Sequence, residues 1–490
     1  MLNRRNLSHI ALNITGMVLP MLVGIAVVPG LIQRLGQDRF GALALAWALV
    51  GYFGLLDLGL GRALTQYLAQ QNAAGMPADI QAAMARTARR IMVWIGLGWA
   101  ALLLLGTPWI DSAISMPADV RTEAPAAWAM LAFAVPLLMW STCSTGVLEA
   151  RSRFMAINCV RVPVGAATFF VPWFIALTTN DLRAIMAGLL MVRLVTALVF
   201  AWLARAEFHT KAAAPAGGLQ SLLRFGSWLT VSNVVGPFLA YFDRFAIAAL
   251  LTMAAVTHYT VPFDVLSRMP ALPVAMMGVL FPLLAQTHGR NGLHSPTTAG
   301  LLRSAIRLLL AFWVPALAMT LLLGPWFLHL WVGPELAQHS APVWQWLAVG
   351  IVLNGFAHLP HTLLQSAGRT DLIAKIHLSE LLPYGLALWW ALLHWGVTGA
   401  AVVWTLRVLV DTGLLFACAM RLFPVANNIL ARGLAWALTS GMVMAWMVWA
   451  TPTNAVSSVG RPSTSVLLFS AVCALVWCGY HLQLLRPKKP

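Results

Sequence analysis

The sequence predicts an all-α polytopic membrane protein with about fourteen transmembrane helices, and three observations support this fold class. The 490 residues are 60% hydrophobic and only 9% charged, whereas soluble globular chains carry roughly 25% charged residues. Apolar runs of about 18 residues or more, long enough to cross a hydrocarbon core, recur along the whole chain. These runs are too long and too uniformly apolar to be strands of a membrane barrel.

The apolar runs define the predicted helices in order along the chain. An even number of crossings places both termini on the same side of the membrane. The predicted spans are 10–32, 41–64, 91–110, 125–148, 156–178, 183–204, 222–251, 256–285, 304–331, 342–366, 372–394, 397–420, 429–450 and 464–485.

The basic residues predict the orientation. A net charge of +16 is compatible with nucleic-acid binding, but the Lys and Arg residues concentrate in alternate loops, as the positive-inside rule requires. They include Arg4 and Arg5 at the start and Lys488 and Lys489 at the end. We therefore expect a multi-pass protein of the bacterial inner (cytoplasmic) membrane with both termini in the cytoplasm, and no nucleic-acid partner.

A linker divides the predicted helices into two groups. Residues 206–221 combine Lys211, Pro215 and Gly217 between two hydrophobic blocks, a composition typical of linkers. Six spans precede this linker, six matching spans follow it, and two more are appended. The predicted parts are an N-terminal six-helix lobe (1–205), a cytoplasmic linker (206–221), a C-terminal six-helix lobe (222–425) and two additional transmembrane helices (426–490).

Charged and Pro residues recur at corresponding positions of the two predicted lobes. Lobes with an even number of helices are related by an axis along the membrane normal, which makes a parallel repeat. The pattern favours two equivalent lobes around a central cavity. The matching sets are Arg161 and Pro163 with Glu380 and Pro383, Arg193 with Arg407, and Asp57 and Arg62 with Asp264 and Arg268.

Ionisable residues within the spans are the candidate functional residues. Each costs roughly 2.5 to 3.5 kcal/mol at the centre of a lipid-facing helix, so together they must face the bundle interior or a wet cavity. A cationic cavity suits an anionic headgroup, above all a phosphate or pyrophosphate, which guanidinium groups bind in a bidentate manner. The candidates for this cavity are Arg161, Arg193, Arg407, Arg62 and Arg268, and those for ion coupling or charge pairing are Asp57, Asp264, Glu380 and Asp411.

Mutual neutralisation is the alternative role for these charges. Asp264 with Arg268, and Arg407 with Asp411, are four residues apart, so each pair shares a helix face and could form an ion pair. Arg161 has no acidic residue one turn away on its own helix, and the same holds for the arginine of the sixth span. The first lobe therefore carries a predicted excess of positive charge.

Enzymatic and metal chemistry find no support in the sequence. The chain lacks a Walker motif and a nucleophile constellation, so we expect neither an enzyme nor a cofactor. His358 and His361 are one turn apart, but we expect Pro360 between them to disrupt the helix. Because no carboxylate completes that site, no metal is predicted.

Several stretches resemble a known family. The loop RLGQDRFG at 34–41 and the segment GYFGLLDLGLGRA at 51–63 carry most of the resemblance, and the stretches 225–245 and 396–407 agree with it. They resemble bacterial O-antigen and capsule-type flippases, the polysaccharide-transporter branch of the multidrug/oligosaccharidyl-lipid/polysaccharide exporter superfamily. The likeness spans nearly the whole chain, and none of its motifs is catalytic.

The resemblance implies export of an undecaprenyl-pyrophosphate-linked oligosaccharide, such as an O-antigen or exopolysaccharide repeat unit, from the cytoplasmic to the periplasmic leaflet by alternating access. It also implies membrane lipids, a glycan polymerase and other assembly proteins as partners. A lipid II flippase and a cation-coupled drug or metabolite antiporter of the same superfamily are the alternatives. A membrane glycosyltransferase would usually need a periplasmic loop larger than any predicted here.

Overall fold

The computed structural model of the chain is helical. It describes residues 4–55, 60–73, 75–209, 239, 241–291, 296–424, 427–435 and 438–439. These residues form helices joined by short turns, and no strand occurs among them, which confirms the predicted all-α class. Eight of the described helices are long and apolar enough to cross a membrane. The count of fourteen stays a prediction, because much of the predicted seventh, thirteenth and fourteenth spans lies outside the described residues.

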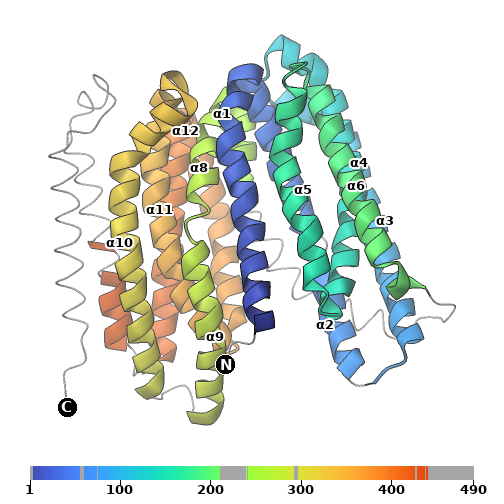
Figure 1. Cartoon of the computed structure of the whole chain (residues 1–490). Coiled ribbons are helices and arrows are strands. Elements are labelled where there is room, and N and C mark those ends of the chain that lie inside the picture. Colours follow the sequence, from blue (N-terminus) through green and yellow to red (C-terminus); the bar gives the residue numbers. More distant parts are fainter. Residues whose placement is uncertain are drawn as a thin grey trace. The chain divides into compact units, whose positions relative to one another are not determined.

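The chain divides into two compact units, Met1–Thr257 and His258–Pro490. Most of the predicted linker lies outside the described residues, so the predicted lobe boundaries stay predictions. The first unit contains α1 (Arg4–Leu55), α2 (Leu60–Ala73), α3 (Ala78–Ala113), α4 (Ala118–Ala150), α5 (Phe154–Ile175), α6 (Leu182–Leu203), the 3-10 helix η1 (Arg205–Phe208) and a helical stretch at 241–250 (Figure 1). The second contains most of α8 (Met253–Leu266), then α9 (Ala271–Asn291), α10 (Pro296–Val332), α11 (Pro334–Ser366) and α12 (Thr370–Leu422).

Two of the long helices are interrupted by a single glycine. Gly36 in α1 has φ 75° and ψ 169°, and Gly396 in α12 has φ 58° and ψ −145°, conformations that only glycine adopts readily. In α1, Gly24 before the break and Trp47 after it both pack on Phe169. The first and second predicted spans, and likewise the eleventh and twelfth, are therefore joined by glycine breaks rather than by extended loops.

The predicted span 256–285 was wrong as a single helix. A turn at 267–270 ends α8 and precedes α9. Pro270 lies in this turn, where its missing N–H and its restriction on Met269 stop the helix. The structure therefore places two shorter helices where the sequence predicted one.

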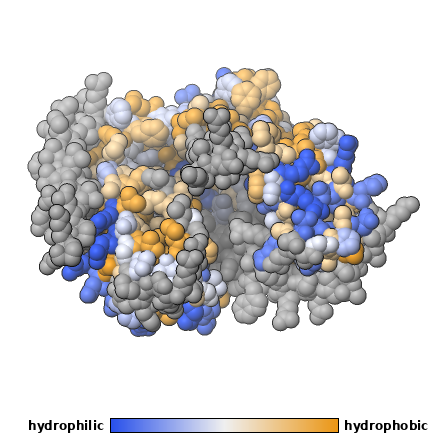
Figure 2. Space-filling model, turned by 60° about the horizontal axis from the view of Figure 1, so that its bottom comes forward, coloured by the Kyte–Doolittle hydropathy of each residue, from blue (hydrophilic) through white to orange (hydrophobic). Residues whose placement is uncertain are grey.

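One helix forms much of the packed interior of each unit. In the first unit, α4 buries Ala127, Trp128 and Leu131. In the second, α11 is the most buried of the candidate spanning helices and lies against α9, α10 and α12. A Cβ atom on Gly355 of α11 would meet the indole of Trp313, so glycine is what lets α10 approach this closely. On the face shown in Figure 2, hydrophobic residues and hydrophilic residues gather in separate patches.

Arginines fix the end of the first unit that is predicted to face the cytoplasm. Arg151 follows α4 and donates to Glu207 of η1 and to Asn72 of α2, both at 2.9 Å. Arg153 donates to the carbonyl oxygen of Leu203 at 3.2 Å. These bonds hold the α4–α5 turn against the end of α6.

A carboxylate ties helices together at the opposite end of this unit. Glu123 of α4 accepts from Arg39 Nη2 and from the backbone N–H of Leu182, both at 2.8 Å. Asp181 caps α6 by accepting from the backbone N–H of Arg183. The Arg183 guanidinium also binds Asp181 and holds the pKa of that carboxyl below its ordinary value. The beginning of α6 is thus fixed by side-chain contacts.

Candidate functional site

A cavity of about 430 Å³ lies among α4, α5 and α6 of the first unit. Two of the predicted arginines, Arg161 and Arg193, line it together. Apolar and hydroxyl side chains form the rest of its wall. The other lining residues are Leu138, Ser141, Thr142, Thr145, Val164, Gly165, Thr168, Thr196 and Phe200.

Arg161 stands near the beginning of α5, and about half of its side chain is exposed. Its Nη2 donates to Glu149 Oε1 of α4 at 3.1 Å. The sequence suggested no acidic partner for Arg161 because Glu149 lies on the preceding helix, one residue past the end of the predicted span 125–148. The neighbouring helix therefore supplies a counter-ion that sequence spacing did not reveal.

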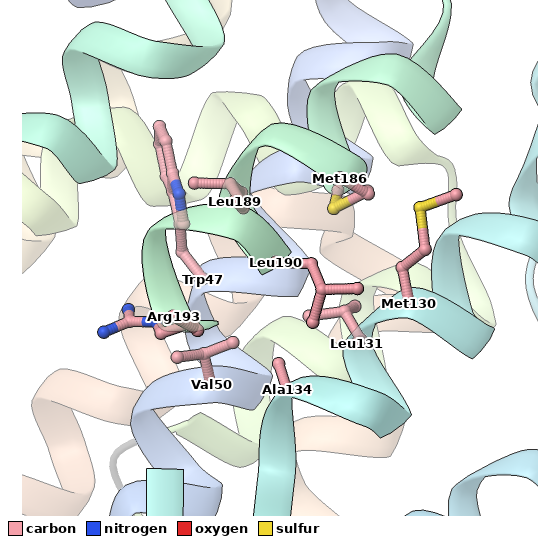
Figure 3. A pocket seen from close by; sticks show the side chains of 9 residues that line it. All are labelled: Trp47, Val50, Met130, Leu131, Ala134, Met186, Leu189, Leu190 and Arg193. Atoms are coloured by element: carbon pink, nitrogen blue, oxygen red, sulfur yellow. The ribbon is translucent and has the colours of Figure 1, made fainter. Parts of the chain in front are cut away.

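Arg193 stands in the middle of α6 and is partly buried. Among the residues that the structure describes, it has neither an ion-pair nor a hydrogen-bond partner. It also borders a small apolar pocket formed with Trp47, Met130 and Leu190. Figure 3 shows the guanidinium of Arg193 pointing away from Met130 and Leu190. Arg193 thus keeps its hydrogen-bond donors available in a largely apolar surrounding.

Four of the five hydroxyl side chains of the cavity wall donate a hydrogen bond within their own helix. Ser141, Thr168 and Thr196 each donate to the carbonyl oxygen one turn earlier in the same helix, at 2.8, 2.9 and 2.6 Å. Thr145 does likewise toward the carbonyl of Ser141 at 2.9 Å. A hydroxyl that donates within its own helix retains lone pairs, so it acts as an acceptor toward other groups. The cavity wall therefore combines cationic donors with hydroxyl acceptors.

In the second unit, two buried carboxylates pair with side chains across the α12 break. Arg407 Nε lies 3.8 Å from Glu380 Oε2, and the guanidinium lies over the ring of Tyr384 at 5.6 Å. Asp411 Oδ1 lies 3.5 Å from His377 Nε2. The suggested intrahelical pair of Arg407 with Asp411 is replaced by pairs between the two halves of α12. His377 lies farther from Gly396 than Glu380 does, and its partner Asp411 lies farther from Gly396 than Arg407 does. The two halves of α12 therefore run antiparallel.

Histidines of α11 border this charged cluster. His361 is in electrostatic range of His358, His377 and Asp411. The helix α11 continues through Pro360, contrary to the expected disruption, because a proline can be accommodated inside a long membrane helix. Within the described parts of the chain, no three His, Cys, Asp or Glu side chains are arranged to hold a metal.

The remaining predicted site residues lie elsewhere. Asp264 is exposed near the end of α8, and Arg268 is exposed in the turn that follows. Because Pro270 forces this turn, the two residues do not share the continuous helix face that their spacing suggested. Arg62 belongs to α2, but its side chain is outside the described residues, as is Asp57 altogether.

Comparisons with known proteins identify the family. Residues 7–288 match the family described as "Polysaccharide biosynthesis protein". A protein of Shigella flexneri named "Putative O-antigen transporter" is 27% identical over 419 residues, which cover 85% of this chain and 98% of that protein. The matched family region includes both arginines of the cavity.

Solved structures share the fold. A multidrug resistance MATE family transporter of the MOP superfamily, in an inward-facing conformation, has a TM-score of 0.70 at 14% identity, covering 88% of this chain and 99% of its own. The lipid II flippase MurJ, in an inward closed conformation, has a TM-score of 0.71 at 11% identity, covering 97% and 100%. Since the family match extends over more than half of its length, the chain belongs to the polysaccharide biosynthesis protein family and is a multi-pass membrane transporter, not an enzyme.

Proposed function

We propose that the protein is a flippase that translocates an undecaprenyl-pyrophosphate-linked oligosaccharide, an O-antigen or exopolysaccharide repeat unit, from the cytoplasmic to the periplasmic leaflet by alternating access. It acts in the bacterial inner membrane, with both termini in the cytoplasm. Family membership and the relative from Shigella flexneri support a polysaccharide-related substrate. A glycan polymerase and other assembly proteins are its proposed partners.

One observation carries this proposal. Arg161 and Arg193 line the same cavity, and no carboxylate among the described residues pairs with Arg193. Two guanidinium groups in one cavity suit a diphosphate, because each can donate two hydrogen bonds to phosphate oxygens. A cation-binding antiporter would need acidic groups in this place, so the cavity favours an anionic substrate.

The depth of the cavity suits capture from the cytoplasmic side. In the predicted orientation, α5 begins and α6 ends at the cytoplasmic face. Arg161 then lies about 10 Å along α5 from Phe154, and Arg193 lies about 15 Å along α6 from Leu203. The headgroup of a lipid in the inner leaflet needs to move only a short distance to reach both guanidinium groups.

The second unit supports the predicted repeat while differing in charge. Glu380 and Arg407 face each other across the halves of α12 at 3.8 Å, in the sequence positions that match Arg161 and Arg193. One member of this matching pair is acidic, so the charges of the pair largely cancel. We accordingly assign Glu380 and Asp411 to charge pairing or ion coupling, with Asp57 and Asp264 as further candidates. Arg407, Arg62 and Arg268 are secondary candidates for diphosphate binding.

The membrane potential can assist export. A diphosphate carries negative charge outward across an inside-negative membrane, which is favoured by about 2.3 kcal/mol per charge per 100 mV. The return of the empty cationic cavity toward the cytoplasm is favoured by the same potential. The two arginines thus both bind the headgroup and make the cycle responsive to voltage.

The test is complementation of a gene deletion, followed by measurement of lipid-linked oligosaccharide in each leaflet. Arg161→Ala and Arg193→Ala should each lower export roughly 10- to 100-fold, because each removes a charge-assisted contact worth about 1.5 to 3 kcal/mol. Arg183→Gln is the matched control, since Arg183 lies on the same helix but pairs with Asp181 outside the cavity. An unchanged leaflet distribution after deletion would refute the flippase proposal and favour the antiporter.

A further inference from the structure

The carboxylate of Glu149 forms an ion pair with Arg161, one of the two cavity arginines. It binds Arg161 at 3.1 Å, while neighbouring basic residues are bonded elsewhere: Arg151 to Glu207 and Arg153 to the carbonyl of Leu203. Among the described residues, Arg161 is therefore the ionic partner of Glu149. The α4–α5 turn between them is fixed, so the pair is a defined feature of the fold.

This ion pair is easily displaced. The side chains of Arg161 and Glu149 are 55% and 32% exposed, and pairs with such exposure contribute little to stability. Glu149 also lies in the last turn of α4, where the helix dipole disfavours a negative charge. A single carboxylate carries one negative charge. A ligand that brings more negative charge than this to Arg161 can therefore displace Glu149.

We propose that Glu149 is a specificity-determining residue that competes with the substrate for Arg161. With Glu149 in place, the charge of Arg161 is partly neutralised and its Nη2 donor is used, whereas Arg193 keeps its full charge. A diphosphate gains the full charge of both arginines only by displacing Glu149, so the residue weakens diphosphate binding and eases its release. This inference rests on the proposed function, because it assumes that the cavity binds a diphosphate.

Neutralising Glu149 has a predictable effect on affinity. Glu149→Gln frees Arg161 and removes a negative charge beside the ligand, so the dissociation constant for farnesyl diphosphate should fall about fivefold. Farnesyl monophosphate carries less negative charge and should gain less. In an Arg161→Ala background, Glu149→Gln should gain only the smaller benefit of removing the charge, because no competition remains.

The experiment measures binding of farnesyl diphosphate and farnesyl monophosphate to the detergent-purified full chain by thermophoresis, with farnesol as the phosphate-free probe. Wild type, Glu149→Gln, Arg161→Ala and the double variant complete a double-mutant cycle. Glu207→Gln is the matched control, since it neutralises a nearby carboxylate that pairs with Arg151 instead. Size-exclusion profiles verify that each variant is folded.

The outcomes separate the inference from the proposed function. Tighter diphosphate binding by Glu149→Gln, mostly lost in the Arg161→Ala background and absent from Glu207→Gln, supports competition. If Arg161→Ala weakens binding but Glu149→Gln leaves it unchanged, the inference fails and the diphosphate site stands. If no protein binds the diphosphate better than farnesol, the proposed function fails together with the inference.

Discussion

The ion pair in the second unit allows a quantitative prediction about stability. Arg407 and Glu380 are 13% and 5% exposed, and their nearest charged atoms are 3.8 Å apart. With an effective dielectric constant of about 20, that distance corresponds to an attraction of about 4 kcal/mol. Arg407→Gln leaves Glu380 buried without its counter-ion, a change that typically costs 3 to 5 kcal/mol.

The expected result is a fall in unfolding temperature of roughly 6 to 20 °C for a cooperative unit of this size. Tryptophan fluorescence of the detergent-purified full chain reports the transition, since the sequence contains 22 Trp residues. Adding Glu380→Gln to Arg407→Gln should restore at least half of the loss, because both charges are then removed. Arg369→Gln is the control: its pair with Asp371 is 43% and 45% exposed and should change stability little.

Additivity would refute this reasoning. If the double variant loses the sum of the two single losses, the two side chains do not stabilise each other, despite their separation of 3.8 Å. An Arg407→Gln variant as stable as the wild type would lead to the same conclusion. Either result would also weaken the assignment of Glu380 to charge pairing and strengthen its assignment to ion coupling.

Further substitutions test the connections between helices, each by thermal unfolding. Glu123→Gln should destabilise the first unit by about 2 to 3 kcal/mol, because it weakens the charged bond to the Leu182 N–H; a change below 0.5 kcal/mol, a threshold of about the thermal energy, would contradict this. Asp181→Asn should destabilise the protein at neutral pH but not in acid. The lowered pKa of Asp181 means that its carboxylate contributes stability above the ordinary pKa of about 4, and that this contribution is lost as pH falls through the pKa in the folded protein. A destabilisation that does not change with pH would count against this reasoning. Gly396→Ala should cost about 1 to 3 kcal/mol through backbone strain, whereas Gly413→Ala, at a helical position with open space beside it, should not.

The fold was predictable to the level of individual helices but not of their junctions. Long apolar runs set both ends of α5, α6 and α12 within about three residues, whereas α3, α4, α10 and α11 begin about 7 to 13 residues before the predicted spans. The breaks at Gly36 and Gly396 were predicted only as gaps between spans, because hydropathy does not reveal the backbone angles of a glycine. The turn at 267–270 was missed because apolar residues continue on both sides of it.

The candidate site shows a similar division. The sequence predicted an excess of positive charge from Arg161 and Arg193, and the structure brings both to one cavity. It could not reveal Glu149 as the partner of Arg161, since that contact depends on how α4 packs beside α5. Spacing suggested pairing of Arg407 with a residue on its own helix, whereas the antiparallel register of α12 selects Glu380.

The glycine break in α12 has a consequence for biogenesis. Because Gly396 leaves almost no loop between the halves, we expect the two helices to enter the bilayer together as one inserted unit. Glu380 on a lone nascent segment would cost roughly 2.5 to 3.5 kcal/mol to insert, and Arg407 would face a similar barrier. Paired within one hairpin, each residue offsets part of the other's charge as the segment leaves the translocon, so the break also determines how these helices reach the membrane.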